Sequence, residues 1–238
     1  MLVNADAKAL EWVCAALLSQ DPTAMREITN GEDQHSANQE AFGLPSRLIA
    51  KKFLFRVIYG GTGSGFANDP DFGLIGNADF WDKVIEAFYK KYPGMHTWHI
   101  ELMNTVLTTG QTRIPTGRTY LFPANEVAHN PKFWRPKILN YSVQGLGAEL
   151  MAISRRNLWL LLSGVNPRPL LIDTVHDSIV LDTLENEWYN ISKILEKAFK
   201  DVPSVYETMF SSPFQLPMRA EISYGRDWKN MTEIEFND

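Results

Sequence analysis

The spacing of apolar positions along the chain predicts a mixture of strands and helices. Residues 2–6 form a short strand-like run that leads directly into a helix-like apolar stretch at residues 10–18. Amphipathic periodicity predicts further helices at residues 80–92, 95–107, 148–162 and 187–199. Asp6 therefore lies at a strand-to-helix corner, where a carboxylate either projects from a rigid edge or caps the helix.

Two apolar strand-like runs lie close together in the last third of the chain. Residues 170–175 and 179–182 flank His176-Asp177-Ser178. This arrangement predicts a β-hairpin that presents the aspartate at a tight turn. A His-Asp pair alone is common, so its meaning depends on the two flanking strands.

One predicted helix, residues 45–61, carries a distinctive surface stripe. Proline stands at its entrance and a glycine pair at its exit, which is typical of a helix with a sharp stop. Two cations followed by two aromatic residues recur at every fourth position: Arg47, Lys51, Phe55 and Tyr59. The stripe rises about 18 Å and suits a nucleotide whose phosphates lie at the positive N-terminal end. The alternative is a core helix with a solvated basic rim.

The segments after this helix read as connectors. Residues 60–76 are rich in Gly, Asn and Asp and are predicted to form a loop. Its Gly61-x-Gly63-x-Gly65 spacing is a weak phosphate-loop signal, because no strand–loop–helix context supports it. Residues 113–123 predict a hairpin with Thr116-Gly117 at the turn.

The composition narrows the class of protein. With 238 residues, 45% of them hydrophobic, the chain can bury a sizeable core as one large domain or two small ones. The single cysteine, Cys14, excludes an internal disulfide and fits a reducing cytoplasm. No apolar run is long enough to span a bilayer, and no secretory signal is present. The net charge of −5 argues against an unspecialised basic nucleic-acid binder.

The striped helix resembles a known sequence motif. Arg-x3-Lys-x3-Phe-x3-Tyr-Gly is similar to motif B of the family A DNA polymerases. In that family the motif is the mobile fingers helix that closes on the incoming deoxynucleotide. The resemblance implies that Arg47 and Lys51 neutralise the triphosphate, with Lys51 also a candidate acid for pyrophosphate, and that Phe55 and Tyr59 pack on the sugar and base.

Two further motifs of the family follow in the expected order. Asp6-x4-Glu11 resembles motif A, in which the aspartate binds both catalytic metals and the glutamate excludes a 2′-hydroxyl. Val175-His176-Asp177 resembles motif C, the second metal-binding turn. The resemblance therefore implies two Mg²⁺ ions held between Asp6 and Asp177.

Other positions are assigned by the same resemblance. His35, in Asp33-x-His35, would touch the triphosphate, although a lone histidine beside acidic neighbours is also an ordinary surface residue. Asn140 and Gln144 share a helix face and would contact the template and the primer-terminal pair through the minor groove; capping or core hydrogen bonds are the alternative. DNA contacts are also predicted for His176 and Arg118.

Three positions depart from the family pattern. Ser178 stands where the family most often has Glu, Pro136 where it usually has Arg, and Arg56 where it usually has a small residue. We expect an active site with altered properties that still functions, and the template contact at residue 136 is in question.

The resemblance, which extends from Asp6 to Trp228, implies an α+β fold. A palm with an antiparallel sheet would comprise residues 1–20 and 123–238, and a helical fingers subdomain residues 21–122, with a return hairpin near 113–123. The thumb and exonuclease domain would be absent, because motif A begins close to Met1. Exposed apolar sheet edges around Leu2, Val3 and Ile172 are then expected.

The predicted function is template-directed addition of deoxynucleotides to a primer 3′-hydroxyl. Primer-template DNA and dNTPs are the implied ligands, and the predicted protein is the catalytic half of a split, phage-encoded polymerase in the host cytoplasm. Its partner would be a separate chain carrying the thumb and a 3′→5′ exonuclease. The alternatives are a truncated fragment, a catalytically weak accessory fragment that binds primer-template, and a related single-subunit RNA polymerase, which Glu11 disfavours.

Overall fold

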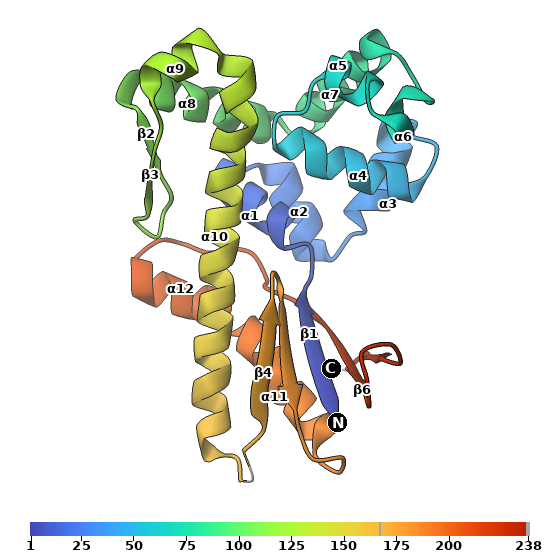
Figure 1. The fold of residues 1–238 in the computed structure, drawn as a ribbon, viewed down its shortest axis with the longest axis vertical. Helices are drawn as coiled ribbons and strands as arrows, with labels where there is room; N and C mark the ends of the chain where they lie inside the picture. Colours follow the sequence, from blue (N-terminus) through green and yellow to red (C-terminus); the bar gives the residue numbers. More distant parts are fainter. Residues whose placement is uncertain (167, 237–238) are drawn as a thin grey trace. The chain divides into compact units, whose positions relative to one another are not determined.

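The computed structural model describes residues 1–166 and 168–236, which form two compact units (Figure 1). Unit 1 contains Met1–Leu10 and the chain from Leu146 onward, and unit 2 contains Glu11–Gly145. The predicted palm and fingers boundaries, at residues 20/21 and 122/123, stay predictions. The last two residues of the predicted palm, 237 and 238, lie outside the described residues.

Unit 1 is built on an antiparallel five-stranded sheet in the order β4-β5-β1-β6-β7. The strands are β1 (Leu2–Ala7), β4 (Leu170–Val175), β5 (Ser178–Asp182), β6 (Ala220–Gly225) and β7 (Thr232–Ile234). The first strand therefore lies at the centre of the sheet, between β5 and β6. The antiparallel α+β arrangement predicted from the sequence is confirmed.

The central strand has a buried face and a more open one. Val3, Ala5 and Ala7 of β1 are buried, whereas the residues between them are half-buried. Helix α11 (Trp188–Lys200) packs on β1 and β6, and α12 (Val202–Phe210) follows it. This packing fixes the alternate positions of β1, including Asp6, on the face that is not buried.

Strand β4 lies at an edge of this sheet and is exposed along most of its length. It pairs with β5 on one side, and its register shifts between Leu171 and Asp173. Apolar side chains on it remain in contact with solvent, with Leu170 64% and Ile172 48% exposed. The predicted exposure at Ile172 is confirmed, but Val3 is fully buried and Leu2 is half-buried. The central position of β1 explains this difference.

Unit 2 is mostly helical. Its helices are α1 (Leu10–Ser19, from Glu11 onward), α2 (Pro22–Asn30), α3 (Gln34–Ala41), α4 (Arg47–Ile58), α5 (Gly63–Ala67), α6 (Pro70–Gly73), α7 (Ala78–Lys91), α8 (Pro93–Thr109) and α9 (Ala124–His129). A two-stranded hairpin, β2 (Gln111–Arg113) and β3 (Thr119–Leu121), joins α8 to α9. The predicted hairpin is confirmed, with Gly117 in its turn at φ 96°.

The glycine-rich stretch after α4 is not the loop that its composition predicts. It contains the short helices α5 and α6, capped by the side chains of Thr62 and Asp69. Phe66 and Phe72 from these helices are buried against Trp81 of α7, with ring centroids 5.2 and 5.1 Å away. Burial of these aromatic rings therefore orders a segment that local propensity favours as a loop.

The longest helix, α10 (Pro131–Leu161), begins 17 residues before the predicted start at residue 148. Pro136 lies inside it, where proline removes one backbone hydrogen bond. Ile138, Leu139 and Val143 are fully buried along the same stretch. Their burial compensates for the local penalty and continues the helix through the proline. No helix within the described part of the chain is long and apolar enough to cross a membrane.

Candidate functional site

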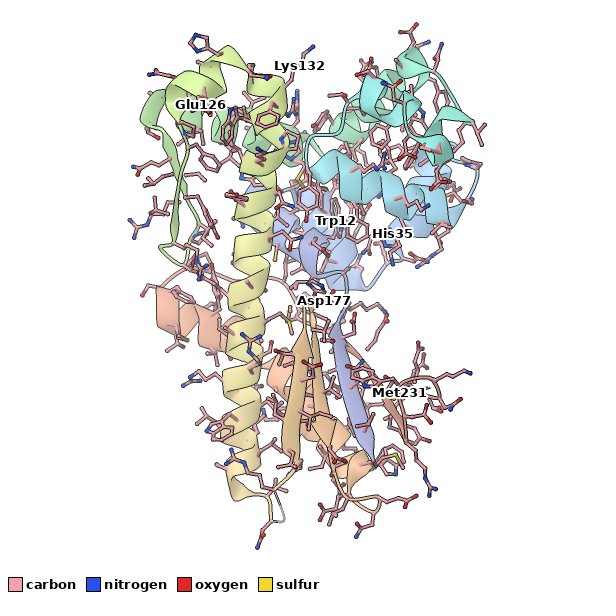
Figure 2. All side chains as sticks on the ribbon, viewed as in Figure 1. Trp12, His35, Glu126, Lys132, Asp177 and Met231 are labelled. Carbon is pink, nitrogen blue, oxygen red and sulfur yellow. The ribbon has the colours of Figure 1, made fainter. Side chains whose placement is uncertain are left out.

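Asp6 and Asp177 lie at the same end of two neighbouring strands in unit 1. Asp6 pairs with Ser178, and the backbone N–H of Ala7 donates to the carbonyl oxygen of Asp177 at 2.9 Å. Asp177 sits in the two-residue turn between β4 and β5, after His176 with a φ of 52°. Positive φ at a non-glycine residue is uncommon and concentrates at functional turns. The predicted hairpin thus brings the two aspartates together (Figure 2 labels Asp177).

This pair has the donor chemistry that Mg²⁺ prefers. Magnesium is held in proteins by one or two carboxylates together with water and substrate phosphates, and seldom by an all-protein cage. Within residues 1–166 and 168–236, no group of three or more His, Cys, Asp or Glu side chains is arranged as a metal site. Two carboxylates on adjacent strands therefore fit metal ions whose remaining ligands come from a substrate.

Helix α4 in unit 2 presents the predicted stripe to solvent. Ala50, Phe53, Leu54, Val57 and Ile58 form its buried face. On the other side Arg47 and Lys51 are exposed, and Phe55 and Tyr59 are half-buried. The Ser46 hydroxyl caps the helix by accepting from the Ile49 N–H at 3.2 Å. The chain therefore uses the apolar residues of this helix for the core and leaves the stripe outside that core.

The first cation of the stripe is held by a carboxylate. Arg47 donates to both oxygens of Asp33, from Nε at 2.7 Å and from Nη2 at 3.2 Å. This charge-assisted hydrogen bond holds the pKa of Asp33 well below its usual range. Lys51, in contrast, forms no ion pair with any residue that the structure describes. Its charge is therefore available for a phosphate.

His35 is buried next to the same group of residues (Figure 2). Its ring centroid is 6.3 Å from that of Phe55, and its Nδ1 has no hydrogen-bond partner among the described residues. Burial, reinforced by the charge of Arg47, lowers the pKa of His35 to about 4. The imidazole is therefore neutral at physiological pH.

Glu11, Tyr59 and Gln144 meet at a second point of unit 2. The Nε2 amide of Gln144 donates to the Tyr59 hydroxyl at 2.9 Å and lies 3.4 Å from Oε1 of Glu11. Burial raises the pKa of Tyr59 to about 12, so its hydroxyl keeps its proton at neutral pH. The structure thus joins the predicted sugar gate, the end of the predicted fingers helix and a predicted DNA contact in one hydrogen-bonded group.

The other predicted DNA contacts lie at or near the protein surface. His176 and Arg118 are exposed, and Asn140 is half-buried on α10.

Ser178 is buried and its hydroxyl donates to the Val175 carbonyl at 3.0 Å, so it closes the hairpin turn. Arg135, next to Pro136, donates from Nη2 to the Tyr89 hydroxyl at 3.1 Å. That interaction directs Arg135 into the unit, and it does not replace the arginine missing at residue 136.

Asp33 contributes to the candidate site in a way that its sequence motif does not predict. It belongs to the Asp33-x-His35 motif, and in the structure it both caps α3 and orients Arg47. Aspartate is a favoured helix cap, and the Asp33 side chain accepts from the N–H groups of His35 and Ser36, two and three residues later. Its pairing with Arg47, fourteen residues away, has no local sequence signal.

Comparison with known proteins shows the family to which this chain belongs. Residues 1–230 match the model of "DNA polymerase family A". The chain is 24% identical to the DNA polymerase of Bacillus phage SP01, over all of this chain and 27% of that protein. It is 25% identical to DNA polymerase I of Aquifex aeolicus, over 83% of this chain and 35% of that protein. The chain therefore spans about a third or less of the length of these relatives.

A solved structure shares the fold. The POL domain of Pol1 from M. smegmatis, in complex with DNA primer-template and dNTP, superposes with a TM-score of 0.79 at 21% identity. The match covers 95% of this chain and 40% of that one. Together with the family match over residues 1–230, these findings place the chain in DNA polymerase family A.

Proposed function

We propose that this chain contains the catalytic core of a template-directed DNA polymerase, which adds deoxynucleotides to the 3′-hydroxyl of a primer. The observation that carries the proposal is the placement of Asp6 and Asp177 at one end of adjacent strands, tied by the Ala7–Asp177 backbone hydrogen bond. Phosphoryl transfer depends on positioning and charge neutralisation more than on covalent catalysis. The carboxylate pair of unit 1 and the cationic helix α4 of unit 2 supply the two kinds of group that this chemistry needs.

The two aspartates would hold two Mg²⁺ ions. When bound, such ions lower the pKa of the primer hydroxyl and stabilise the charge on the leaving pyrophosphate. The primer oxygen forms the new bond to the α-phosphorus, the bond from that phosphorus to the bridging oxygen breaks, and pyrophosphate leaves. Asp6 and Asp177 would help to position the reacting groups by holding these ions.

Residues of unit 2 would bind the nucleotide. Arg47 and Lys51 would neutralise the triphosphate, and Lys51 would give a proton to pyrophosphate. Phe55 and Tyr59 pack on the sugar and base, and the carboxylate of Glu11 fills the space that a 2′-hydroxyl needs. The neutral imidazole of His35 offers a hydrogen bond to a phosphate oxygen. We propose the palm at residues 1–20 and 123–238 and the fingers at 21–122.

Primer extension by the purified chain tests this proposal directly. Asp6→Ala and Asp177→Ala should each abolish nucleotide addition, because each removes a charge shared by the metal ions. Asp182→Ala is the matched control, since Asp182 is an exposed aspartate at the opposite end of the same hairpin. Extension within tenfold of wild type by either site variant would contradict the two-metal assignment.

We further propose that a separate polypeptide, bearing the thumb and a 3′→5′ exonuclease, completes the enzyme in the cytoplasm. The open edge of β4 supports this proposal, because unpaired backbone groups flanked by exposed Leu170 and Ile172 are a template for strand addition. The buried, unpaired thiol of Cys14 fits a reducing compartment.

Solution mass and processivity test the second proposal. We expect short, distributive extension at physiological salt and concentration-dependent association, which Ile172→Lys should suppress because a charged edge resists strand pairing. A monodisperse monomer that extends primers processively by itself would contradict the need for a partner.

A further inference from the structure

One segment of unit 2 differs in charge from the rest of the chain. Residues 111–141 contain five lysine or arginine residues and a single acidic residue, Glu126, although the whole chain has a net charge of −5. The same segment contains five aromatic residues: Tyr120, Phe122, Phe133, Trp134 and Tyr141. Basic residues interleaved with aromatic ones are the composition of surfaces that bind single-stranded nucleic acid.

The N-terminal half of α10 displays part of this segment on one face. At about 100° per residue, Phe133, Lys137, Asn140, Tyr141 and Gln144 all fall within a sector about 100° wide. Asn140 and Gln144 are the predicted contacts to the primer-terminal pair. Phe133 and Lys137 extend the same face toward the start of the helix, where Lys132 lies (Figure 2). Tyr141 lies on this face between Asn140 and Gln144.

The first part of this face is an aromatic ring beside a lysine. Phe133 is 54% exposed, and the Lys137 Nζ lies 3.8 Å from its ring centroid and 4.7 Å from that of Trp134. The two rings hold the ammonium group close to the helix surface. A base stacked near Phe133 would therefore place its phosphate within reach of a positioned charge.

The second part is a ring supported from below. Tyr141 is 47% exposed, and its ring centroid lies 5.6 Å from that of Tyr120 and 5.7 Å from that of Phe122. A Cβ at Gly145 would lie 1.7 Å from the Tyr120 hydroxyl oxygen, so glycine is required for the hairpin to pack here. The buried core that includes Phe122, Ile138 and Leu139 supports this arrangement. The Tyr141 ring is therefore held in place by packed neighbours.

We propose that Phe133, Lys137 and Tyr141 form a stacking surface for the unpaired template strand ahead of the primer terminus. From Phe133 to Tyr141 the helix rises about 12 Å, enough for about three nucleotides at the spacing of one DNA strand. Bases in a duplex have no free faces for such stacking, so the ligand is single-stranded. This inference rests on the proposed function, because it places the template relative to the predicted contacts of Asn140 and Gln144.

Fluorescence anisotropy with two primer-templates tests the surface. Both share one duplex, but one has a template overhang of about 12 nucleotides, within the usual range of single-strand site sizes, and the other an overhang of one nucleotide. Phe133→Leu and Tyr141→Leu keep apolar bulk but remove the rings. Each should weaken binding of the long-overhang DNA about fivefold or more and leave binding of the short-overhang DNA unchanged.

The charge is tested separately. Lys137→Gln should reduce the steepness of the plot of log affinity against log salt by about 0.7 for the long overhang, as expected for one lost phosphate contact. Tyr189 and Lys193 provide a matched control on α11, because the Lys193 Nζ lies 4.5 Å from the centroid of the exposed Tyr189 ring. Tyr189→Leu and Lys193→Gln should change neither quantity.

The outcomes separate this inference from the proposed function. Equal affinity of the wild-type chain for both DNAs, or wild-type binding by the folded Phe133 and Tyr141 variants, would overturn the stacking surface even if the chain extends primers. Preferential, ring-dependent binding of the long overhang by a chain that adds no nucleotide would support the surface and refute the polymerase activity. Circular dichroism melting curves establish that each variant is folded.

Discussion

The side-chain amide of Gln144 donates a hydrogen bond to the Tyr59 hydroxyl while lying 3.4 Å from a carboxylate oxygen of Glu11. The three residues come from α10, the end of α4 and α1, and are separated by up to 133 positions in the chain. Each one was predicted to contact a different part of the primer, template or nucleotide. Their contact means that a change at one residue alters the position of the other two.

Glu11→Ala should raise ribonucleotide incorporation. The carboxylate and the Tyr59 ring together would fill the space that a 2′-hydroxyl requires, so removal of the carboxylate opens it. The measurement is the ratio of kcat/KM for dNTP and rNTP in single-nucleotide primer extension. Glu40→Ala, at an exposed position of α3, is the control and should keep the wild-type ratio. An unchanged ratio in Glu11→Ala would remove this residue from the sugar site.

Lys51→Ala should lower kcat/KM for dNTP by about 10²-fold or more, the range expected for a general acid. Lys52→Ala is an unusually close control. Lys52 is the next residue in the chain, but it is ion-paired with Asp71 and lies off the stripe. The Lys52→Ala substitution should change kcat/KM for dNTP by less than threefold. Equal effects of the two substitutions would show that α4 contributes only general positive charge.

The buried His35 predicts a pH-dependent stability. Its pKa in the folded chain is about 4, below the usual value of 6.5, because burial disfavours the charged form. The unfolded chain therefore binds a proton that the folded chain does not. The stabilisation is fully present above pH 6.5 and is lost as the pH falls from about 6.5 to about 4.

Urea unfolding at pH 7.5 and pH 5.0 measures this effect. Wild type should lose more free energy of unfolding between the two values than His35→Gln does. His99, whose pKa burial lowers to about 3, titrates over the same range and is present in both proteins, so the difference isolates His35. Identical pH dependence of the two proteins would contradict the burial of a neutral imidazole.

Gly60→Ala should destabilise the chain more than Gly43→Ala. Both glycines have positive φ, 78° and 61°, which costs other residues about 1–3 kcal/mol. At Gly60 a Cβ would also lie 2.9 Å from the Arg135 Nε and 3.0 Å from the Leu139 Cδ1, whereas at Gly43 nothing lies within 4 Å. The difference in unfolding free energy between the two variants measures the clash at the exit of α4. Equal destabilisation would show that Arg135 can move aside without penalty.

Part of this fold is encoded by local patterns. The apolar runs around His176 and Asp177 are long enough to specify two strands, and two intervening residues leave a tight turn as their connection. The striped helix begins and ends near its proline and glycine signals, because those residues act on the backbone directly. The strand-to-helix corner at Asp6 is predictable for the same reason, since the strand and the following helix are both short-range features.

Other parts depend on tertiary packing and carry no local signal. Phe66 and Phe72 order the glycine-rich segment only because Trp81 lies against them. Helix α10 begins earlier than its local sequence predicts. Burial of Ile138 and Leu139 offsets the cost of Pro136, which lies between the helix start and these two residues. The contact of Glu11 with Gln144 likewise requires the folded unit, since spacing along the chain says nothing about it.

The proline inside α10 has a consequence for local motion. Pro136 has no N–H to donate to the carbonyl of Lys132, so the first turns of the helix are joined to the rest by one hydrogen bond fewer than usual. Amide hydrogen exchange should therefore be faster before residue 136 than in the stretch around Leu139 and Val143. The end of α10 that carries Phe133 is a hinged terminal segment, able to change its bend while the remainder of the helix keeps its shape.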